Sequence, residues 1–384
     1  MRPPPIPDAV RIVEVSPRDG LQNIPHQIPT STKVELISRL SRTGVHSIEL
    51  TSIVSPRAVP QLADCRGLLR SDAVRHLQRR RAVDGKDEAK GGSDGADADA
   101  NTDTDAGVLR LPVLVPNVKG LEIALAHGVD EVAVFVSATE GFSRANINCS
   151  VEEGLERAVE VARIARKKGV AVRGYISSIF TDPITNSPTP FSSVHKCTTT
   201  LLAAGVYEVS LGDTTGTGTP SLVRSLLTYL TTHEVPVPVP KLGGHFHDSH
   251  GRGLENVWEA YLCGVRVYDS SVAGLGGCPF APGAKGNVAT EEVVGMFEGR
   301  GVRTGVDARV LGEVARWVKR EVSEGGESDV EREEKEREKG RGLGYGQANL
   351  DTNGALSRPS RSPVRSRIPT SWTACGFVRP VVYD

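Results

Sequence analysis

The sequence predicts a closed barrel of eight parallel strands, each followed by a helix, that is, a (β/α)8 barrel. Eight short runs rich in β-branched residues recur along the chain, longer amphipathic stretches separate them, and no GxGxxG motif follows any of the runs. Strands that alternate with helices form parallel sheets, and eight such units favour closure into a barrel. The missing glycine motif argues against an open doubly wound sheet, which is the alternative.

Each predicted strand is a short extended run, beginning with RIVEVS and ending with VRVYDSSVAG. The eight runs occupy residues 11–16, 47–52, 111–116, 131–138, 171–178, 207–213, 241–248 and 265–274. Residues 32–44 and 150–169 are typical of the helical stretches between them. In both, apolar residues recur at a spacing of three or four, and a glycine closes the stretch.

Two segments do not follow this alternation. Residues 79–107 hold almost no large apolar side chains, which predicts a solvated, disordered insertion before the third strand. Residues 321–384 contain the charged run ESDVEREEKEREKGRG and are predicted to form a disordered tail. A role of this tail in binding a partner is the alternative. The barrel domain is therefore expected at residues 8–320.

Composition excludes several classes of function. The 384 residues are 38% hydrophobic and 24% charged with a formal net charge of −1, so neither nucleic acid nor an anionic membrane is an expected partner. No apolar run approaches the roughly 20 residues that span a bilayer. The six cysteines form no CxxC pair, as expected of free thiols in a reducing compartment.

The start of the chain, MRPPPIPDAV, has no apolar signal core and no amphipathic transit pattern. We therefore expect a cytoplasmic protein. The mitochondrial matrix is the alternative, if a presequence is missing from the sequence.

The stretch GGHFHDSHG places His245 and His247 two residues apart on a predicted strand. Side chains alternate between the two faces of a strand, so both imidazoles point the same way. The end of that strand lies at the C-terminal mouth of the barrel, where such barrels have their active sites. The pair predicts a metal site, and a hydrogen-bonded pair of core histidines is the alternative.

Other ionisable and polar residues occur at the ends of separate predicted strands. They are Arg18, Asp19, Glu49, Asp213, Cys278 and Asn287. Their gathering at one rim indicates a site rather than core packing. A set of aspartate, two histidines and asparagine without thiolate ligands suits Mg²⁺ or Mn²⁺, whereas zinc would more often recruit cysteine or a third histidine.

Several motifs carry a family resemblance. They are VEVSPRDGLQN, IELTS, FSRANINCS, SLGDTTGTGTP, HFHDSHGRGLEN and DSSVAGLGGCPFAPGAKGNVATE. Together they resemble the hydroxymethylglutaryl-CoA lyase family of the metal-dependent pyruvate-carboxyltransferase/aldolase superfamily, over residues 11–310 outside the insertion. The resemblance implies a TIM barrel that cleaves 3-hydroxy-3-methylglutaryl-CoA, or a close 3-hydroxy-acyl-CoA analogue, into acetyl-CoA and acetoacetate. It also implies an acyl-CoA substrate and a role in leucine catabolism or ketone body metabolism.

The resemblance also implies roles for individual residues. Asp19, His245, His247 and Asn287 would be the ligands of the cation. Arg18 would contact the thioester oxygen, with Glu49 beside the cation and the substrate. Either Asp19 or His245 would take the proton of the tertiary hydroxyl.

Two further roles have a structural alternative. Cys278 would act as acid and base on a mobile loop, and the alternative is a small buried side chain. Asp213 would help to shape the substrate pocket, or would hold its own Thr-Gly turn.

Two other functions remain open at this point. A Claisen-type synthase of the isopropylmalate or homocitrate type would use the same barrel and metal, and a non-catalytic barrel would use neither for chemistry. The stretch GYISSIFTDPITNSPTP departs from the family, which usually has a cysteine there, so the departure bears on substrate detail. A homodimer is compatible with the sequence.

Overall fold

The computed structural model describes residues 9–79, 108–276 and 285–323. Within these residues, nine strands form one sheet in which every neighbouring pair is parallel. They are β1 (Arg11–Glu14), β2 (Ser47–Ile48), β3 (Thr51–Ser52), β4 (Val113–Leu114), β5 (Glu131–Ser137), β6 (Ala171–Ser177), β7 (Glu208–Asp213), β8 (Leu242–Phe246) and β9 (Val267–Ser270).

The sheet closes on itself because β2 and β3 are two halves of one extended run. β2 pairs with β1, and β3 pairs with β4, so the two ends of the strand order meet in this run. Its backbone bonds both neighbours: Glu49 donates to the carbonyl of Glu14, and Leu50 donates to the carbonyl of Pro112. Counting this run once gives eight positions around the cylinder, which confirms the predicted (β/α)8 barrel.

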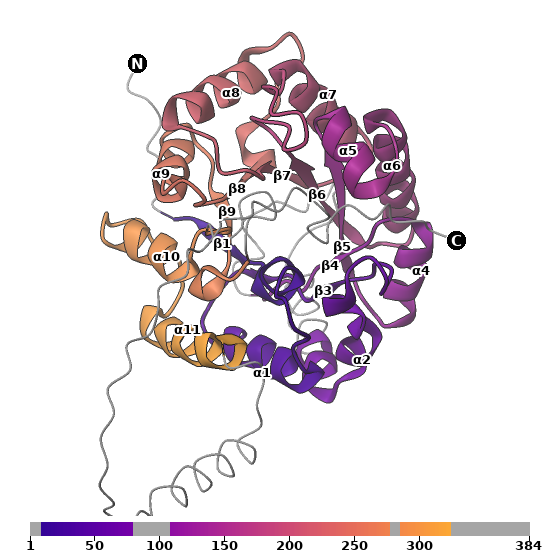
Figure 1. Cartoon of the computed structure of the whole chain (residues 1–384), viewed down its shortest axis with the longest axis vertical. Helices are drawn as coiled ribbons and strands as arrows, with labels where there is room; N and C mark the ends of the chain where they lie inside the picture. Colours follow the sequence, from indigo (N-terminus) through magenta and orange to yellow (C-terminus); the bar gives the residue numbers. More distant parts are fainter. Residues whose placement is uncertain (1–8, 80–107, 277–284, 324–384) are drawn as a thin grey trace, which may run out of the picture.

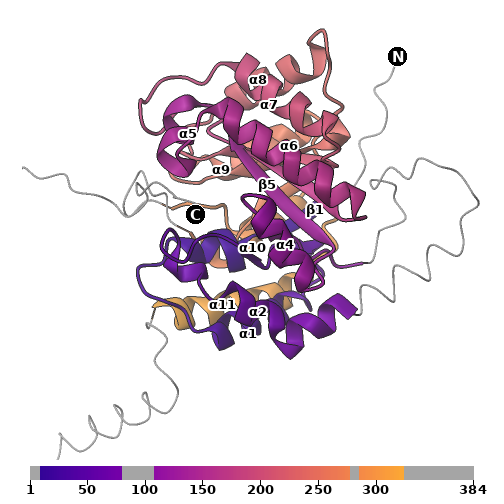
Figure 2. The ribbon, with the colours of Figure 1, turned by 90° about the vertical axis from the view of Figure 1, so that its right-hand side faces the viewer.

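Helices surround this cylinder on the outside (Figures 1 and 2). They are α1 (Thr30–Leu40), α2 (Cys65–Arg70), α4 (Val118–Ala126), α5 (Glu140–Ile147), α6 (Val151–Lys167), α7 (Phe191–Ala203), α8 (Pro220–Thr232), α9 (Gly253–Leu262), α10 (Thr290–Glu298) and α11 (Ala308–Ser323). Residues 72–79 are also helical. Among the described residues, none of these helices combines the length and the apolar character that crossing a membrane requires.

Helix α6 shows how closely local sequence determines an element. Ser150 accepts a hydrogen bond from the backbone of Glu153, and the Glu153 side chain accepts one from the backbone of Ser150, which is a capping box. Leu155, Ala158 and Ala162 are buried at the spacing of three and four that indicated a helix over 150–169.

Two predicted strands are shorter than their sequence runs. The run 111–116 is a strand only at Val113–Leu114, and the run 265–274 leaves the strand after Ser270 and enters a 3-10 turn, Val272–Gly274. Ala273 in this turn has a φ of 62°, which a strand cannot accommodate. The predicted disordered insertion and tail fall almost entirely on residues 80–107 and 324–384, outside the described residues.

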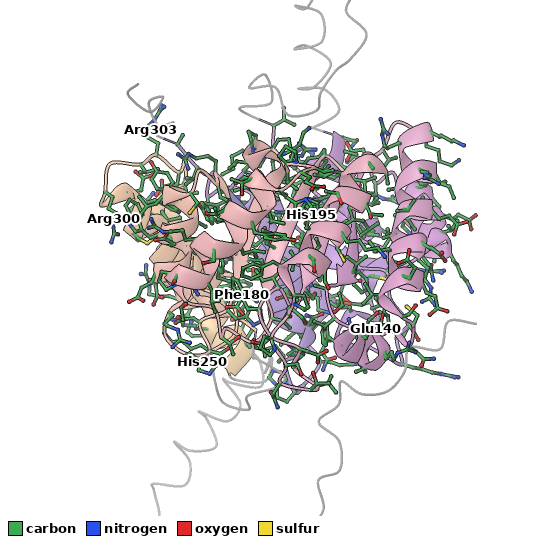
Figure 3. All side chains as sticks on the ribbon, turned by 90° about the horizontal axis from the view of Figure 1, so that it is seen from above. Glu140, Phe180, His195, His250, Arg300 and Arg303 are labelled. Atoms are coloured by element: carbon green, nitrogen blue, oxygen red, sulfur yellow. The ribbon has the colours of Figure 1, made fainter. Side chains whose placement is uncertain are left out.

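The two ends of the barrel can be told apart by the residues that lie there. His250 and Glu140, which follow β8 and β5, lie at the end of the molecule opposite to Arg303 (Figure 3). Arg303 accompanies the start of the first strand, because its carbonyl accepts a hydrogen bond from Val10. The first of these ends is therefore the C-terminal mouth, where the predicted site residues gather.

Candidate active site

A single turn of π-helix after β1, Ser16–Gly20, carries Arg18 and Asp19. The backbone amides of Arg18, Asp19 and Gly20 all donate to the carbonyl of Val15. A side chain at Gly20 would place its Cβ 2.7 Å from Oγ of Ser271, so the turn packs against the end of β9 only because this residue is glycine.

The buried side chain of Glu14 connects this turn to two other segments of the chain. Its Oε1 accepts from the backbone amides of Ser16 (2.9 Å) and Val272 (3.0 Å), and its Oε2 accepts from the Thr290 hydroxyl (2.7 Å). Burial raises the pKa of this carboxyl to about 7. One buried side chain thus joins the turn after β1 to the segments on either side of residues 277–284.

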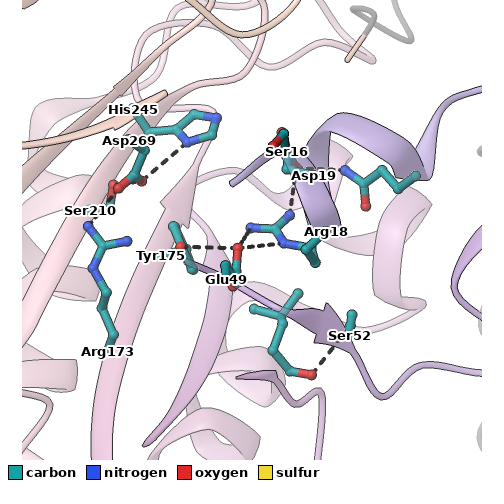
Figure 4. A network of polar contacts seen from close by, with 12 residues as sticks. Ser16, Arg18, Asp19, Glu49, Ser52, Arg173, Tyr175, Ser210, His245 and Asp269 are labelled. Carbon is teal, nitrogen blue, oxygen red and sulfur yellow. Dashed lines mark hydrogen bonds and ion pairs between the residues drawn. The ribbon is translucent and has the colours of Figure 1, made fainter. Parts of the chain in front are cut away.

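Arg18 is held by two carboxylates (Figure 4). Its Nε and Nη2 each lie 2.7 Å from Oε2 of Glu49, and its Nη1 lies 2.5 Å from Oδ1 of Asp19. The Tyr175 hydroxyl donates to the same Glu49 oxygen at 3.3 Å. Burial alone would lower the pKa of Arg18, but Glu49 and Asp19 outweigh it and raise that pKa above its ordinary value. The guanidinium is therefore a fixed positive charge.

His245 on β8 and His247 directly after it converge, as the sequence predicted, although the strand ends at Phe246. The Nε2 atoms of His245 and His247 are 3.3 Å apart, and both side chains are buried. One ligand atom each from Asp19, His245 and His247 lie within 4.8 Å of one another. Asp19 follows β1, His245 belongs to β8 and His247 follows it directly, so the barrel brings together residues more than 220 positions apart in the chain.

Asp269 on β9 orients His245. Its Oδ2 lies 3.2 Å from Nδ1 of His245 and also accepts from the Ser210 hydroxyl at 2.6 Å, while its Oδ1 accepts from Arg173 at 2.8 Å (Figure 4). Burial opposes ionisation of Asp269, but Arg173 and His245 outweigh it and lower the pKa to about 2. A carboxylate on Nδ1 leaves Nε2 of His245 as the free donor atom, an arrangement that recurs in metal sites.

The two imidazoles titrate differently. Burial lowers the pKa of His247 to about 4, and the neighbouring His245 acts in the same direction. Burial would also lower the pKa of His245, but the hydrogen bond and the charge of Asp269 raise it above its ordinary value. His247 is therefore neutral near pH 7, which is the state that binds a metal ion.

Asn287 completes the donor set. Its Nδ2 donates to Oδ2 of Asp19 at 2.7 Å and to the carbonyl of Leu275 at 3.2 Å, which leaves Oδ1 as an acceptor. Arg18 and His245 lower the pKa of Asp19, although burial opposes them. Carboxylate, amide oxygen and two imidazoles without a thiolate fit a hard divalent cation.

Four of the predicted site residues described above line a cavity of about 170 Å³. Arg18, Asp19, His245 and His247 form one polar face, together with Gln22 and Thr214. The rest of the lining is mainly apolar and includes Val54, Val59, Leu62, Leu114, Phe135, Phe142 and Ile147. Sequence reasoning missed Tyr175, Gln22 and Asp269, although Tyr175 and Asp269 stand inside predicted strands.

Asp213 and Cys278 remain of the residues that the sequence singled out, and His250, Asn117 and Asn146 are three further polar residues. Asp213 accepts from the backbone of Gly218 at 2.9 Å within its own loop, and burial raises its pKa to about 6. His250 bonds the carbonyl of Gly216, and Asn117 caps α4. Asn146 lines the cavity. Cys278 lies outside the described residues.

The chain is similar to known proteins over most of its length. A family model described as HMGL-like matches residues 9–318. A mitochondrial hydroxymethylglutaryl-CoA lyase of Arabidopsis thaliana is 46% identical over 302 residues, which are 79% of this chain and 57% of that protein. A cytoplasmic 3-hydroxy-3-methylglutaryl-CoA lyase of Mus musculus is 40% identical over 327 residues, which are 85% of each chain.

Solved structures show the same likeness. The HMG-CoA lyase of Brucella melitensis superposes with a TM-score of 0.69 at 43% identity, covering 81% of this chain and 98% of that one. An HMG-CoA lyase of Acinetobacter baumannii, in complex with coenzyme A and 3-methylmalate, gives 0.68 at 29% identity, covering 82% and 92%. These structures share the barrel, and one of them binds coenzyme A.

Proposed function

The chain belongs to the HMGL-like family, and we propose that it cleaves 3-hydroxy-3-methylglutaryl-CoA into acetyl-CoA and acetoacetate. It is a carbon–carbon lyase with an acyl-CoA substrate. The single observation that supports this activity best is the meeting of Asp19, His245 and His247 beside Arg18 in one cavity. A barrel kept only for binding would not need a buried set of converging metal ligands.

The family is dependent on a divalent metal ion, and we assign Asp19, His245, His247 and Asn287 as its ligands. Mg²⁺ or Mn²⁺ suits these oxygen and nitrogen atoms. A cation bound there would lower the pKa of the tertiary hydroxyl of the substrate. Asp269 beside Nδ1 would keep His245 in the tautomer whose Nε2 is free to bind the metal.

Two side chains can accept the hydroxyl proton, Asp19 and His245. Nδ1 of His245 faces Asp269, so Nε2 can hold either a cation or a proton, but not both. Both oxygens of Asp19 already accept hydrogen bonds, Oδ1 from Arg18 and Gln22 and Oδ2 from Asn287. We therefore keep both Asp19 and His245 as proposed bases.

Arg18 stabilises the charge that moves to the thioester oxygen as the carbon–carbon bond breaks. Glu49 and Asp19 hold three of its nitrogens, and the guanidinium still offers further N–H groups toward the cavity that it lines. A guanidinium that is already oriented does not have to reorganise during the reaction. Glu49 acts on the substrate by keeping Arg18 in this orientation.

The acetyl-CoA enolate must then be protonated at carbon, and we assign Cys278 as the donor. Asp213 shapes the pocket through its loop, since Thr214 of the same loop lines the cavity. Residues 8–320 form the catalytic domain. We also propose a cytoplasmic location, as in the mouse relative, and a homodimer.

Incubation of the metal-free chain with substrate tests the activity. Addition of Mg²⁺ or Mn²⁺ to the chain and hydroxymethylglutaryl-CoA should release acetoacetate in an amount equal to acetyl-CoA. If free thiol were instead released from acetyl-CoA only when a 2-oxo acid is added, the chain would be a Claisen-type synthase. The same assay with each ion alone identifies the metal that supports turnover.

A further inference from the structure

Helix α5 forms part of the apolar wall of the cavity. Phe142, Asn146 and Ile147 all line the cavity, and they lie four and five residues apart, on one face of the helix. The polar lining of the same cavity includes Arg18 and three of the candidate metal ligands, Asp19, His245 and His247. The position of α5 therefore affects the shape of the cavity in which the reaction is proposed to take place.

The N-terminus of α5 rests on Asp182. A Cβ added to Gly141 would stand 2.4 Å from Oδ2 and 2.7 Å from Oδ1 of Asp182, so the helix backbone and the carboxylate are in direct contact. Asp182 is only 4% exposed, and its Oδ1 accepts from the backbone amides of Ile184 (2.8 Å) and Thr185 (3.1 Å). A carboxylate at this end of a helix is favourable, because the helix dipole is positive there.

Asp182 belongs to a segment with its own internal structure, residues 181–190. Its backbone amide donates to Ser187, and Thr189 donates from its amide to Phe180 and from its hydroxyl to Ser178. These bonds fold the segment into a small hairpin at the mouth of the barrel. The sequence here, TDPITNSPTP, is the stretch that departs from the family.

The same segment also contacts the next loop of the mouth. The Thr181 and Thr217 hydroxyls are 2.9 Å apart, and the Thr214 hydroxyl accepts from the backbone of Ser178 at 2.9 Å. Thr214 lines the cavity on its polar side. Residues 178–190 thus connect α5, through Asp182, to the loop that carries Thr214 and Thr217.

We propose that Asp182 and its segment position α5, and that α5 selects the apolar substituent on carbon 3 of the acyl group. This inference rests on the proposed function. Carbon 3 of the hydroxymethylglutaryl group carries one apolar branch, the methyl group, while its other branches end in oxygen-bearing groups. The oxygen atoms face the polar side, so the methyl group faces Phe142 and Ile147. Asp182 is a positioning residue, because it contacts the helix and not the cavity.

Gly141→Ala tests the positioning. The new methyl group cannot coexist with the Asp182 carboxylate in its present place, so the carboxylate or α5 must shift, and the contact between them is disturbed. A methyl group in an apolar pocket is worth roughly tenfold or more in affinity. We therefore expect the KM for hydroxymethylglutaryl-CoA to rise about tenfold. The inhibition constant of 3-hydroxyglutaryl-CoA should change less than about twofold, because this ligand has no methyl group to place against the wall.

Two further variants make the result specific. Gly295→Ala in α10 is the matched control, since a Cβ there meets nothing within 4 Å, and both constants should stay as in the wild type. Asp182→Ala removes the carboxylate on which the N-terminus of α5 rests. This variant should also lower the discrimination between the two ligands, in the same direction as Gly141→Ala, and unchanged discrimination would overturn the inference.

If Gly141→Ala fails to fold, Phe142→Leu tests the wall directly and should raise the KM for the methylated substrate alone. Equal changes in both constants, or no change in a folded Gly141→Ala variant, would overturn the inference. Affinities of both ligands can be measured by calorimetry without turnover. A chain that binds them with the expected ratio but does not cleave would contradict the proposed function and leave this inference standing; binding of neither would overturn both.

Discussion

The barrel contains two buried polar clusters, one at each end, and they are built on different rules. At the N-terminal end, three arginines face three carboxylates; the cluster consists of Arg11, Arg110, Arg173, Glu131, Glu208 and Asp269. At the C-terminal mouth, carboxylate and imidazole atoms of Asp19, His245 and His247 point at one another. The first cluster balances its charges within the chain. The second brings a carboxylate and two imidazoles together while Arg18 and Asn287 donate to Asp19, and its ligand atoms can take up a cation or protons.

The two clusters show that a buried charge can contribute to stability or to function. A buried carboxylate that pairs with a guanidinium already has its counter-charge. Removing the carboxylate therefore lowers the free energy of unfolding. A set of ligand atoms that face one another does not stabilise the fold by itself. It is kept for its function, and other parts of the fold supply the stability. Asp269 belongs to both clusters, because Arg173 binds one of its oxygens and His245 lies beside the other.

Arg173→Met should give the largest effect on stability. Arg173 is 1% exposed and bonds Glu208 and Asp269, each at 2.8 Å, so its removal takes the nearest guanidinium from two buried carboxylates, although Glu208 keeps Arg11 at 3.3 Å. Breaking a buried ion pair on one side costs about 3–5 kcal/mol. Urea unfolding would measure this decrease. A change below about 1 kcal/mol would remove the distinction between the two clusters.

Arg18→Gln should affect turnover rather than metal binding. Glutamine keeps a hydrogen bond to Glu49 but supplies no charge to the thioester oxygen. Removing such a transition-state interaction lowers kcat by about 10²–10³-fold. The kcat and the number of metal ions bound per chain should be measured on the same preparation. A normal kcat would remove Arg18 from the mechanism, and failure to bind the metal would make it a structural residue.

Asp269→Asn tests the residue shared by both clusters. Asparagine keeps the size of the side chain but removes the charge that orients His245. Removing such a partner weakens metal binding about 10–100-fold. Calorimetric titration of Mn²⁺ into the metal-free variant would measure it. Ser210→Ala is the milder control, because it removes one hydrogen bond to Asp269 and keeps the charge.

His46 is influenced by Arg11 and Arg110 of the N-terminal cluster, and its protonation should make the stability of the fold depend on pH. Burial lowers the pKa of His46 to about 3, and Arg11 and Arg110 lower it in the same direction. The unfolded chain, with an ordinary pKa of 6.5, therefore takes up the proton first as the pH falls. Stability from this group is complete above pH 6.5 and declines toward pH 3.

For this half-buried side chain we expect a decrease of about 1 kcal/mol at pH 5. Unfolding by urea at pH 7 and pH 5 would measure it. His46→Gln should flatten this part of the profile, and a variant with the same slope as the wild type would assign the pH dependence to other groups.

The sequence was sufficient for the fold and for part of the site. Strand and helix periods are local properties, so the barrel could be predicted from them, and the HxH pair could be placed at the mouth because a strand fixes its alternation. The role of Asp269 could not be predicted, because its contacts with Arg173 and His245 span 96 and 24 residues. The brevity of β4 could not be predicted either, since the curvature of a closed sheet decides how much of a run pairs.

The sequence also does not show which ion pairs are buried. An ion pair on the surface shows how strongly the contribution of such a pair to stability depends on burial. Arg309 and Glu313 on α11 are 2.8 Å apart, the same distance as Arg173 and Glu208, but their side chains are 75% and 52% exposed. Their spacing of four residues makes the pair visible in the sequence, whereas the buried pair is not. Water screens the exposed charges, and such pairs contribute about 0.3–0.5 kcal/mol. Arg309→Met should therefore change the free energy of unfolding by no more than that, and this small change should vanish at high salt. A decrease as large as that of Arg173→Met would mean that distance, and not burial, sets the strength of the pairs in this barrel.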